Sequence, residues 1–278
     1  MKAIFDGLSA QFSEQTTKKY STSFSLGIKF LDKEFHGPVY AIYGFVRFAD
    51  EIVDSFHGFD KQELLNKFCD DTAHAIQHKI SLNPILNSFQ QTVCAYNIEM
   101  PLIETFLQSM KMDLQQGEHN CESFKKYILG SAEVVGLMCL RVFTKGDNDM
   151  YQRLKPSAMK LGSAFQKVNF LRDAKDDFEV LGRNYFPNVN FAQFNQEQKL
   201  LIEKDINDDF SEALEGIRQL PNGSGRGVYL AYYYYKKLFD KIRRSPVEKV
   251  MSERIRIPNS NKVVFMFNSY LRHQLNMF

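Results

Sequence analysis

Two pairs of aspartates, each set in apolar and helix-like sequence, are the residues of this chain best suited to chemistry. Asp50 and Asp54 are four residues apart, and Asp173 and Asp177 repeat that spacing later in the chain. An α-helix places residues at this spacing one turn apart on one face. Because like charges repel there and burial is costly without a compensating cation, the two pairs predict a site for hard divalent ions.

Mg²⁺, with Mn²⁺ as the alternative, is the ion that we expect at such a site. Proteins bind Mg²⁺ through one or two carboxylates together with the phosphates of a substrate. Two carboxylate pairs that face each other therefore predict diphosphate chemistry. The candidate metal ligands are the four aspartates and neighbouring oxygen donors: Asp50, Glu51, Asp54, Asn169, Asp173 and Asp177.

The first pair lies in a segment, 39–56, whose polar residues are confined to one narrow stripe. The stripe follows a spacing of i, i+3, i+4 and i+7 and consists of Arg47, Asp50, Glu51 and Asp54. The other positions are mostly apolar, which is the reverse of a surface helix. The pattern favours a buried helix whose stripe faces an internal cavity; the alternative is a solvated acidic face.

The second segment has the same construction. Its polar face spans about 80° of arc on a helix and contains Gln166, Asn169, Asp173 and Asp177. Arg172 and Asp176 flank this face. Carboxylates, amides and a guanidinium together offer metal ligands, orienting hydrogen bonds and a clamp for diphosphate.

The elements that must position these residues are helices. Apolar residues recur at helical spacing nearly throughout, and no sustained alternation of period two occurs. Asp60 and Asn195 have the sequence context of helix caps, and Pro84 and Pro101 suit first-turn positions. No linker or low-complexity tract divides the chain, and Gly223–Gly227 reads as a connection between helices. We therefore predict an all-α protein with one domain over residues 1–278.

Composition excludes several classes of protein. A formal net charge of +2 without a basic stripe gives no support to nucleic-acid binding. The apolar stretch Val134–Leu140 is interrupted by Arg141 and is too short to span a bilayer, and no secretory signal is visible. The four cysteines have no metal-ligand spacing and are expected to be buried free thiols. We expect a cytoplasmic protein that contacts membranes only peripherally.

Three stretches of the chain resemble the squalene/phytoene synthase family, in the order and spacing of that family's motifs. The first is Ser21-Thr22-Ser23-Phe24-Ser25 with the segment 41–54, and the second is Gly130–Gly136. The third is 166–177, followed by Gly182–Pro187. The resemblance implies an isoprenoid synthase-type helical bundle around a central cavity.

The activity implied by the resemblance is a head-to-head condensation of two prenyl diphosphates. Two geranylgeranyl diphosphates would give phytoene through a cyclopropylcarbinyl diphosphate, with release of diphosphate and without NADPH. The alternative is a squalene or dehydrosqualene synthase that uses two farnesyl diphosphates and needs NADPH only for squalene. A non-catalytic assembly protein is disfavoured, because such a protein would gain nothing from keeping both carboxylate motifs.

The resemblance also implies roles for individual residues. The catalytic set is Asp50, Asp54, Asp173, Asp177, Arg47, Arg172 and Tyr43. The substrate-binding set is Ser21, Ser23, Tyr127, Gln166, Asn169, Tyr235 and Arg254. Two plainer interpretations stay open: the serines can cap the following helix, and Tyr127 and Tyr235 can be core aromatics.

Overall fold

The computed structural model describes residues 1–115, 120–179, 185–187, 189 and 193–258, without the side chains of 176–179 and 222. Within these residues all regular structure is helical, which confirms the predicted all-α class. The elements in chain order are α1 (Lys2–Tyr20), α2 (Thr22–Lys29), α3 (Lys33–Asp54), α4 (Lys61–His78), α5 (Pro84–Tyr96), α6 (Met100–Leu114), α7 (Cys121–Ile128), the π-helical η1 (Leu129–Glu133), α8 (Val134–Thr144), α9 (Asn148–Glu179), α10 (Gln196–Ile217), α11 (Asn222–Arg244) and α12 (Val247–Ser252).

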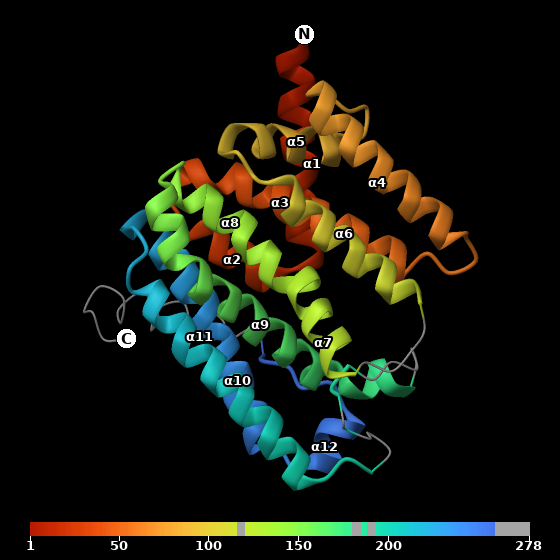
Figure 1. Cartoon of the computed structure of the whole chain (residues 1–278), viewed down its shortest axis with the longest axis vertical. Helices are drawn as coiled ribbons and strands as arrows, with labels where there is room; N and C mark the ends of the chain where they lie inside the picture. The colour runs from red at the N-terminus through yellow and green to blue at the C-terminus, as the bar shows by residue number, and fades with distance from the viewer. Residues whose placement is uncertain (116–119, 180–184, 188, 190–192, 259–278) are drawn as a thin grey trace.

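The helices pack around two large apolar clusters. In Figure 1, α1 and α3–α6 form the upper part of the molecule, and α9–α12 form the lower part. One cluster draws on α2–α6 and α8, and the other on α7 and α9–α12. The helix α9 contacts η1, α8, α10 and α11, so it joins the two parts. Residues of α9 and of α3 line the same cavity.

The predicted helix starts are confirmed. The Asp60 side chain accepts a hydrogen bond from the backbone N–H of Glu63 at 2.9 Å. At Asn195 a complete capping box forms with Gln198. Pro84 is at the start of α5, where its missing N–H costs no helical bond. Local sequence therefore sets where these helices begin.

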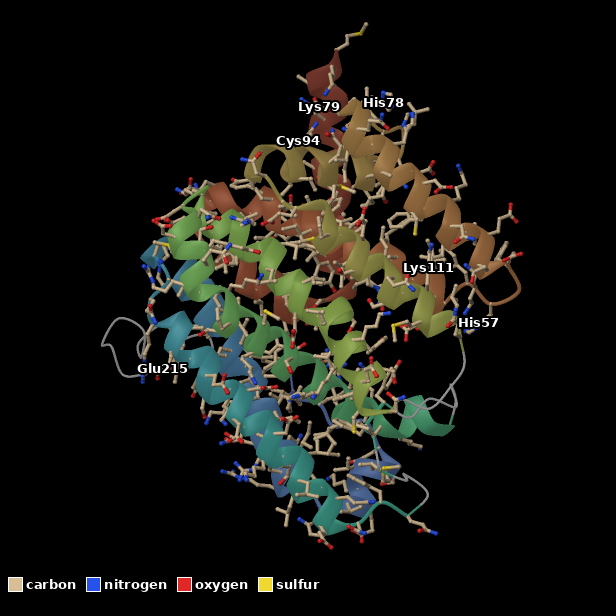
Figure 2. The ribbon with its side chains drawn as sticks, viewed as in Figure 1. His57, His78, Lys79, Cys94, Lys111 and Glu215 are labelled. Atoms are coloured by element: carbon tan, nitrogen blue, oxygen red, sulfur yellow. The ribbon has the colours of Figure 1, made fainter. Side chains whose placement is uncertain are left out.

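Two expectations about local structure are wrong. Gly223–Gly227 is the first part of α11 rather than a connection. Gly227 serves packing rather than a turn, because it lies against α2. A Cβ on Gly227 would lie 2.7 Å from the carbonyl oxygen of Gly27. The cysteines were expected to be buried, but Cys94 and Cys121 are exposed; Figure 2 labels Cys94 on α5.

One continuous helical stretch, Cys121–Thr144, has the length and composition of a membrane span. From the sequence alone we considered only Val134–Leu140 within it, which is too short to span a bilayer. Most of its apolar window is buried inside the protein. It packs against α6 and α9, as the core helix of a folded domain does.

Glycines bring η1 and α8 against their neighbours. A Cβ on Gly162 of α9 would lie 2.7 Å from the carbonyl oxygen of Ala132, and one on Gly130 would lie 2.6 Å from the Cβ of Ser109. Both distances are below van der Waals contact, so a side chain at either position forces the helices apart.

Gly162→Ala is therefore expected to destabilise the protein by about 1–3 kcal/mol, since its Cβ meets backbone atoms that cannot rotate away. The matched control is Gly7→Ala on α1, where a Cβ meets nothing within 4 Å. That change is expected to stabilise the protein by up to about 1 kcal/mol, because alanine favours the helix. Urea denaturation of both variants checks the difference, and equal effects would contradict the close approach.

Candidate active site

An apolar cavity of about 320 Å³ lies between α2, α3, α8, α9 and α11. Small residues of η1, α8 and α9 and aromatic rings of α2 and α9 form much of its wall. Its polar lining consists of Tyr43, Ser131, Gln166, Asn169 and Tyr235. The predicted internal cavity is thus present, and one end of it is marked by these polar groups.

The polar stripe of α3 continues from this end of the cavity. Arg47 is one turn beyond the lining residue Tyr43, and its guanidinium bonds to the carboxylates of both Asp50 and Glu51. The guanidinium also lies over the ring of Tyr20, with 4.3 Å between its carbon and the ring centroid. Burial lowers the pKa of Arg47, but the charges of Asp50 and Glu51 outweigh it and raise the pKa.

The polar stripe of α9 is arranged in the same way. Arg172 donates two hydrogen bonds to Asp173, from Nε at 2.9 Å and from Nη2 at 2.5 Å. Arg254, from the segment after α12, contacts the same carboxylate, with 2.7 Å between its Nε and Oδ1. Asp173 therefore joins two guanidiniums that are far apart in the sequence.

Two tyrosines lie beside the stripes, Tyr43 on α3 and Tyr235 on α11, and both rings contact Phe24. The Tyr235 hydroxyl donates to Asn169 Oδ1 at 3.3 Å, and its ring stacks on Phe165 with centroids 4.0 Å apart. Burial raises the pKa of Tyr43 to about 12, with a smaller contribution of the same sign from Tyr235. Burial also raises the pKa of Tyr235. Both hydroxyls therefore stay protonated at neutral pH and can donate hydrogen bonds to an anion.

The serines of the first motif lie at the start of α2, just before Phe24, which lines the cavity. Ser21 caps α2, and its hydroxyl accepts from the N–H of Phe24 at 3.2 Å, so the plainer interpretation of this residue holds. Its side chain also lies close enough to Tyr43, which lines the cavity, to lower the pKa of that tyrosine against the larger effect of burial. Ser23 is half-buried in the first turn of α2. A cap and a contact to the site are therefore compatible at Ser21.

Three other predicted site residues are Tyr127, Asp54 and Asp177, of which the first two are not among the residues that line the cavity. Tyr127 donates to Asp113 at 2.8 Å and packs among Phe170 and Tyr185. The geometry therefore favours its interpretation as a core aromatic. Asp54 ends α3, one turn beyond Asp50. The backbone of Asp177 belongs to α9, while its side chain lies outside the described residues.

Two residues of the site were missed by sequence reasoning. Tyr20 covers Arg47 although it ends a different helix, and Ser131 lines the cavity. The hydroxyl of Ser131 and the Nε of Arg47 are buried without a hydrogen-bond partner among the described residues. No spacing rule pointed to Tyr20, whereas the small residues of the Gly130–Gly136 motif were a signal for Ser131.

The donor set fits a hard cation, although its carboxylates are paired with arginines. Aspartate, glutamate and amide oxygens are the ligands that Mg²⁺ prefers. No three acidic, histidine or cysteine side chains of the described part of the chain are grouped closely enough to hold a metal. Asp50 contacts Arg47 instead, and Asp173 contacts Arg172 and Arg254. Each carboxylate has two oxygens and several lone pairs, so a cation could share it with the neighbouring arginine.

Glu133, the last residue of η1, follows two residues that line the cavity and is a half-buried acid. Burial, and next the charge of Asp209, raise the pKa of Glu133 from 4.5 to about 7, against the opposing effect of Lys167 and Lys160. Asp209 itself bonds to Ser163 at 2.6 Å and to both lysines. Protonated Glu133 is therefore the form that this environment favours.

Stability is expected to fall as pH rises from about 4.5 to about 7, because the folded protein holds a proton on Glu133 that the unfolded chain has lost. Glu133→Gln should remove this fall. At pH 8 the variant should be more stable than the parent by about 1 kcal/mol, after allowance for partial exposure. Urea denaturation at pH 4.5 and pH 8 measures the stability of the variant and of the parent. If the variant differed from the parent by the same amount at both pH values, Glu133 would not be the group that titrates.

Comparisons with known proteins give a consistent assignment. The family model for squalene/phytoene synthase matches residues 17–261. A phytoene synthase of Arthrospira platensis is 24% identical over 95% of this chain and 93% of its own length. A 15-cis-phytoene synthase of Synechococcus elongatus is 25% identical over 93% of this chain and 91% of its own length.

Solved structures show the same fold. A dehydrosqualene synthase in complex with ligand is 20% identical and superposes with a TM-score of 0.85, covering 98% of each chain. A squalene synthase from Alicyclobacillus acidocaldarius is 20% identical, with a TM-score of 0.74 over 85% of this chain and 93% of that one. The predicted isoprenoid synthase-type helical bundle is thereby confirmed.

Proposed function

Because the chain belongs to the squalene/phytoene synthase family and is a prenyltransferase, we propose that it joins two geranylgeranyl diphosphates head to head to form phytoene. The observation that carries the proposal is an apolar cavity whose polar end adjoins two arginine–carboxylate clusters. The prenyl tails would occupy the cavity, and the diphosphates would lie at its polar end.

The arginines are proposed to bind the departing diphosphates. Arg47, Arg172 and Arg254 supply planar donors that match phosphate oxygens in pairs. The unpartnered Nε of Arg47 supports this role, since a buried donor without an acceptor is stabilised by a ligand oxygen. Mg²⁺ held by Asp50, Asp54, Asp173 and the other predicted ligands would supply further neutralisation of the leaving diphosphate.

The cavity wall is proposed to protect the carbocations that remain. When a diphosphate leaves with its bonding electron pair, the allylic carbon becomes electron-deficient and reacts with any water nearby. The lining near the polar end is aromatic, with Phe24, Phe165 and Tyr235 in mutual ring contact. These rings exclude water and present their negative faces to a cation. The second substrate's double bond is then the available nucleophile.

A dehydrosqualene or squalene synthase acting on farnesyl diphosphate is the second candidate. It is favoured by the likeness to a solved dehydrosqualene synthase and by a 4,4'-diapophytoene synthase of Staphylococcus haemolyticus, which is 24% identical over 74% of this chain. Both candidates use the same residues and differ in the length of tail that the cavity accepts.

Incubation with geranylgeranyl or farnesyl diphosphate, each with and without NADPH, followed by mass spectrometry of the products, tests the proposal. The expected result is a C40 hydrocarbon from geranylgeranyl diphosphate without NADPH. Exclusive turnover of farnesyl diphosphate, or a strict need for NADPH, would overturn the phytoene assignment while leaving the family assignment intact.

Peripheral contact with a membrane is part of the proposal. The substrates carry charged diphosphates, whereas the product has lost both and is wholly apolar. Such a product is stable in a bilayer and not in water. We therefore propose that the enzyme works in the cytoplasm against a membrane surface.

A further inference from the structure

The cavity is long, and α9 runs along its whole length. The residues of α9 that line it share one helical face, which begins at Leu154 and ends at Asn169. These two residues are fifteen positions apart, so the cavity extends about 22 Å along the helix axis. Asn169 marks the polar end, where it accepts a hydrogen bond from Tyr235, and Leu154 marks the far end.

The neighbouring wall, formed by η1 and α8, fixes the depth of each position. Figure 1 shows α8 beside α9, and the two helices run in opposite directions. A Cβ on Gly162 would lie 2.7 Å from the carbonyl oxygen of Ala132, and one on Gly136 would lie 3.0 Å from that of Ala158. Ala132 is therefore level with Gly162, about 10 Å from Asn169, whereas Ala158 is about 16 Å from it.

At the depth of Ala158 the cavity changes from small to large side chains. Ala158 and Gly216 both line it there. The helix α10 reaches this level, because a Cβ on Gly216 would lie 2.3 Å from the Cβ of Ser157. One turn deeper, Leu140 and Leu154 line the cavity and pack in one buried cluster. Ala158 is consequently the last small side chain of α9 before the cavity ends.

The length of the cavity distinguishes the two candidate substrates. Arg172 and Asp173, the proposed contacts of diphosphate and metal, come directly after the level of Asn169, so a tail begins there. An extended carbon chain advances about 1.2 Å per bond, which gives about 13 Å for farnesyl and about 18 Å for geranylgeranyl, with twelve and sixteen main-chain carbons. A farnesyl tail therefore ends short of Ala158, whereas the last isoprene unit of geranylgeranyl lies beside it.

We propose that Ala158 selects the length of the tail. Its methyl group leaves room for the fourth isoprene unit of geranylgeranyl diphosphate, and a larger side chain there would limit the enzyme to farnesyl diphosphate. The inference rests on the proposed function, since it requires the tails to occupy this cavity. Ala158 is about 22 Å along α9 from Asp173, so it affects tail length and takes no part in ionisation.

The test compares kcat/KM for geranylgeranyl and farnesyl diphosphate in Ala158→Leu and in the parent. The ratio of the two values should fall by roughly tenfold to a hundredfold, because the added side chain occupies space that only the longer tail uses. Ala158→Val adds less volume and should lower the ratio by a smaller factor. Circular dichroism checks that both variants fold, and the valine variant carries the test if the leucine variant does not.

The matched variant is Ala132→Leu, the same change at a shallower level. Both tails pass Ala132, about 10 Å from Asn169. Both values of kcat/KM should therefore fall, and their ratio should stay near that of the parent. Ala73→Leu, at an exposed position of α4, should alter neither value.

Binding of unreactive thiodiphosphate analogues of the two substrates, measured by calorimetry, separates this inference from the proposed function. The parent should bind the geranylgeranyl analogue more tightly than the farnesyl analogue, and Ala158→Leu should remove this preference. If the parent forms no phytoene but Ala158→Leu still removes the preference, the proposed activity is wrong and the role of Ala158 stands.

Two results would overturn the inference. One is a folded Ala158→Leu protein that keeps the parent's ratios of kcat/KM and of affinity. The other is a parent that binds the two analogues equally, which would mean that the fourth isoprene unit does not reach the far end of the cavity. A lower ratio in Ala158→Leu, with the ratio of Ala132→Leu unchanged, is the supporting result.

Discussion

Asp173→Ala is expected to lower turnover by a factor on the order of 10³ or more, about 4 kcal/mol in the barrier. The carboxylate is a proposed metal ligand, and it also holds the guanidiniums of Arg172 and Arg254, with Nε–O distances of 2.9 Å and 2.7 Å. Its loss would therefore remove one ligand and release two proposed diphosphate contacts. Initial rates at saturating Mg²⁺ measure the effect.

Asp173→Ala is also expected to be less stable than the parent protein. Charge repulsion between Asp173 and Asp177 alone would predict no loss of stability. Repulsion predicts that removing one aspartate does no harm, but Asp173 is paired with two arginines. Removing it leaves the largely buried Arg172 without its partner, at a cost of about 1–3 kcal/mol.

The matched control is Asp71→Ala on the surface of α4, whose carboxylate pairs only with Lys67 in the described structure. Rates and stability should remain close to those of the parent. Near-normal turnover of Asp173→Ala in the presence of EDTA would contradict the metal site.

Arg47→Ala is expected to slow the reaction by roughly 10²–10³-fold, the usual result of removing one donor to a developing anion. Arg47 has a preset position, since Asp50, Glu51 and the ring of Tyr20 all hold it, and its Nε is unpartnered and buried. Arg47→Lys should restore only part of the rate, because a point charge cannot supply two parallel hydrogen bonds. Single-turnover kinetics separate ionisation from substrate binding.

Arg218→Ala provides the matched control, because Arg218 forms a surface ion pair with Glu215. Its turnover should equal that of the parent. Full rescue by Arg47→Lys would mean that Arg47 contributes only general electrostatic attraction and that the proposed paired contact is absent.

The sequence alone determined the helical class, several helix starts and the faces on which the polar residues lie. Capping at Asp60 and Asn195 depends on residues three positions apart, so it is readable without the fold. The stripes on α3 and α9 follow from helical periodicity in the same way. Arg254 was placed only by family resemblance, since nothing local indicates that it reaches Asp173.

The tertiary structure decided which groups meet. Arg47 and Asp50 are close in sequence, so their contact follows from one helix. Three other features depend on how helices cross: Arg254 contacts Asp173, Tyr20 lies over Arg47, and Tyr127 lies away from the cavity. The helix α1 is the clearest case. Its large apolar residues Ile4, Leu8 and Phe12 are exposed, whereas the small residues Ser9, Ser13 and Thr17 pack inwards, where Ser13 lies against Gly44. Periodicity is a property of one helix, whereas burial depends on the partner that the helix meets.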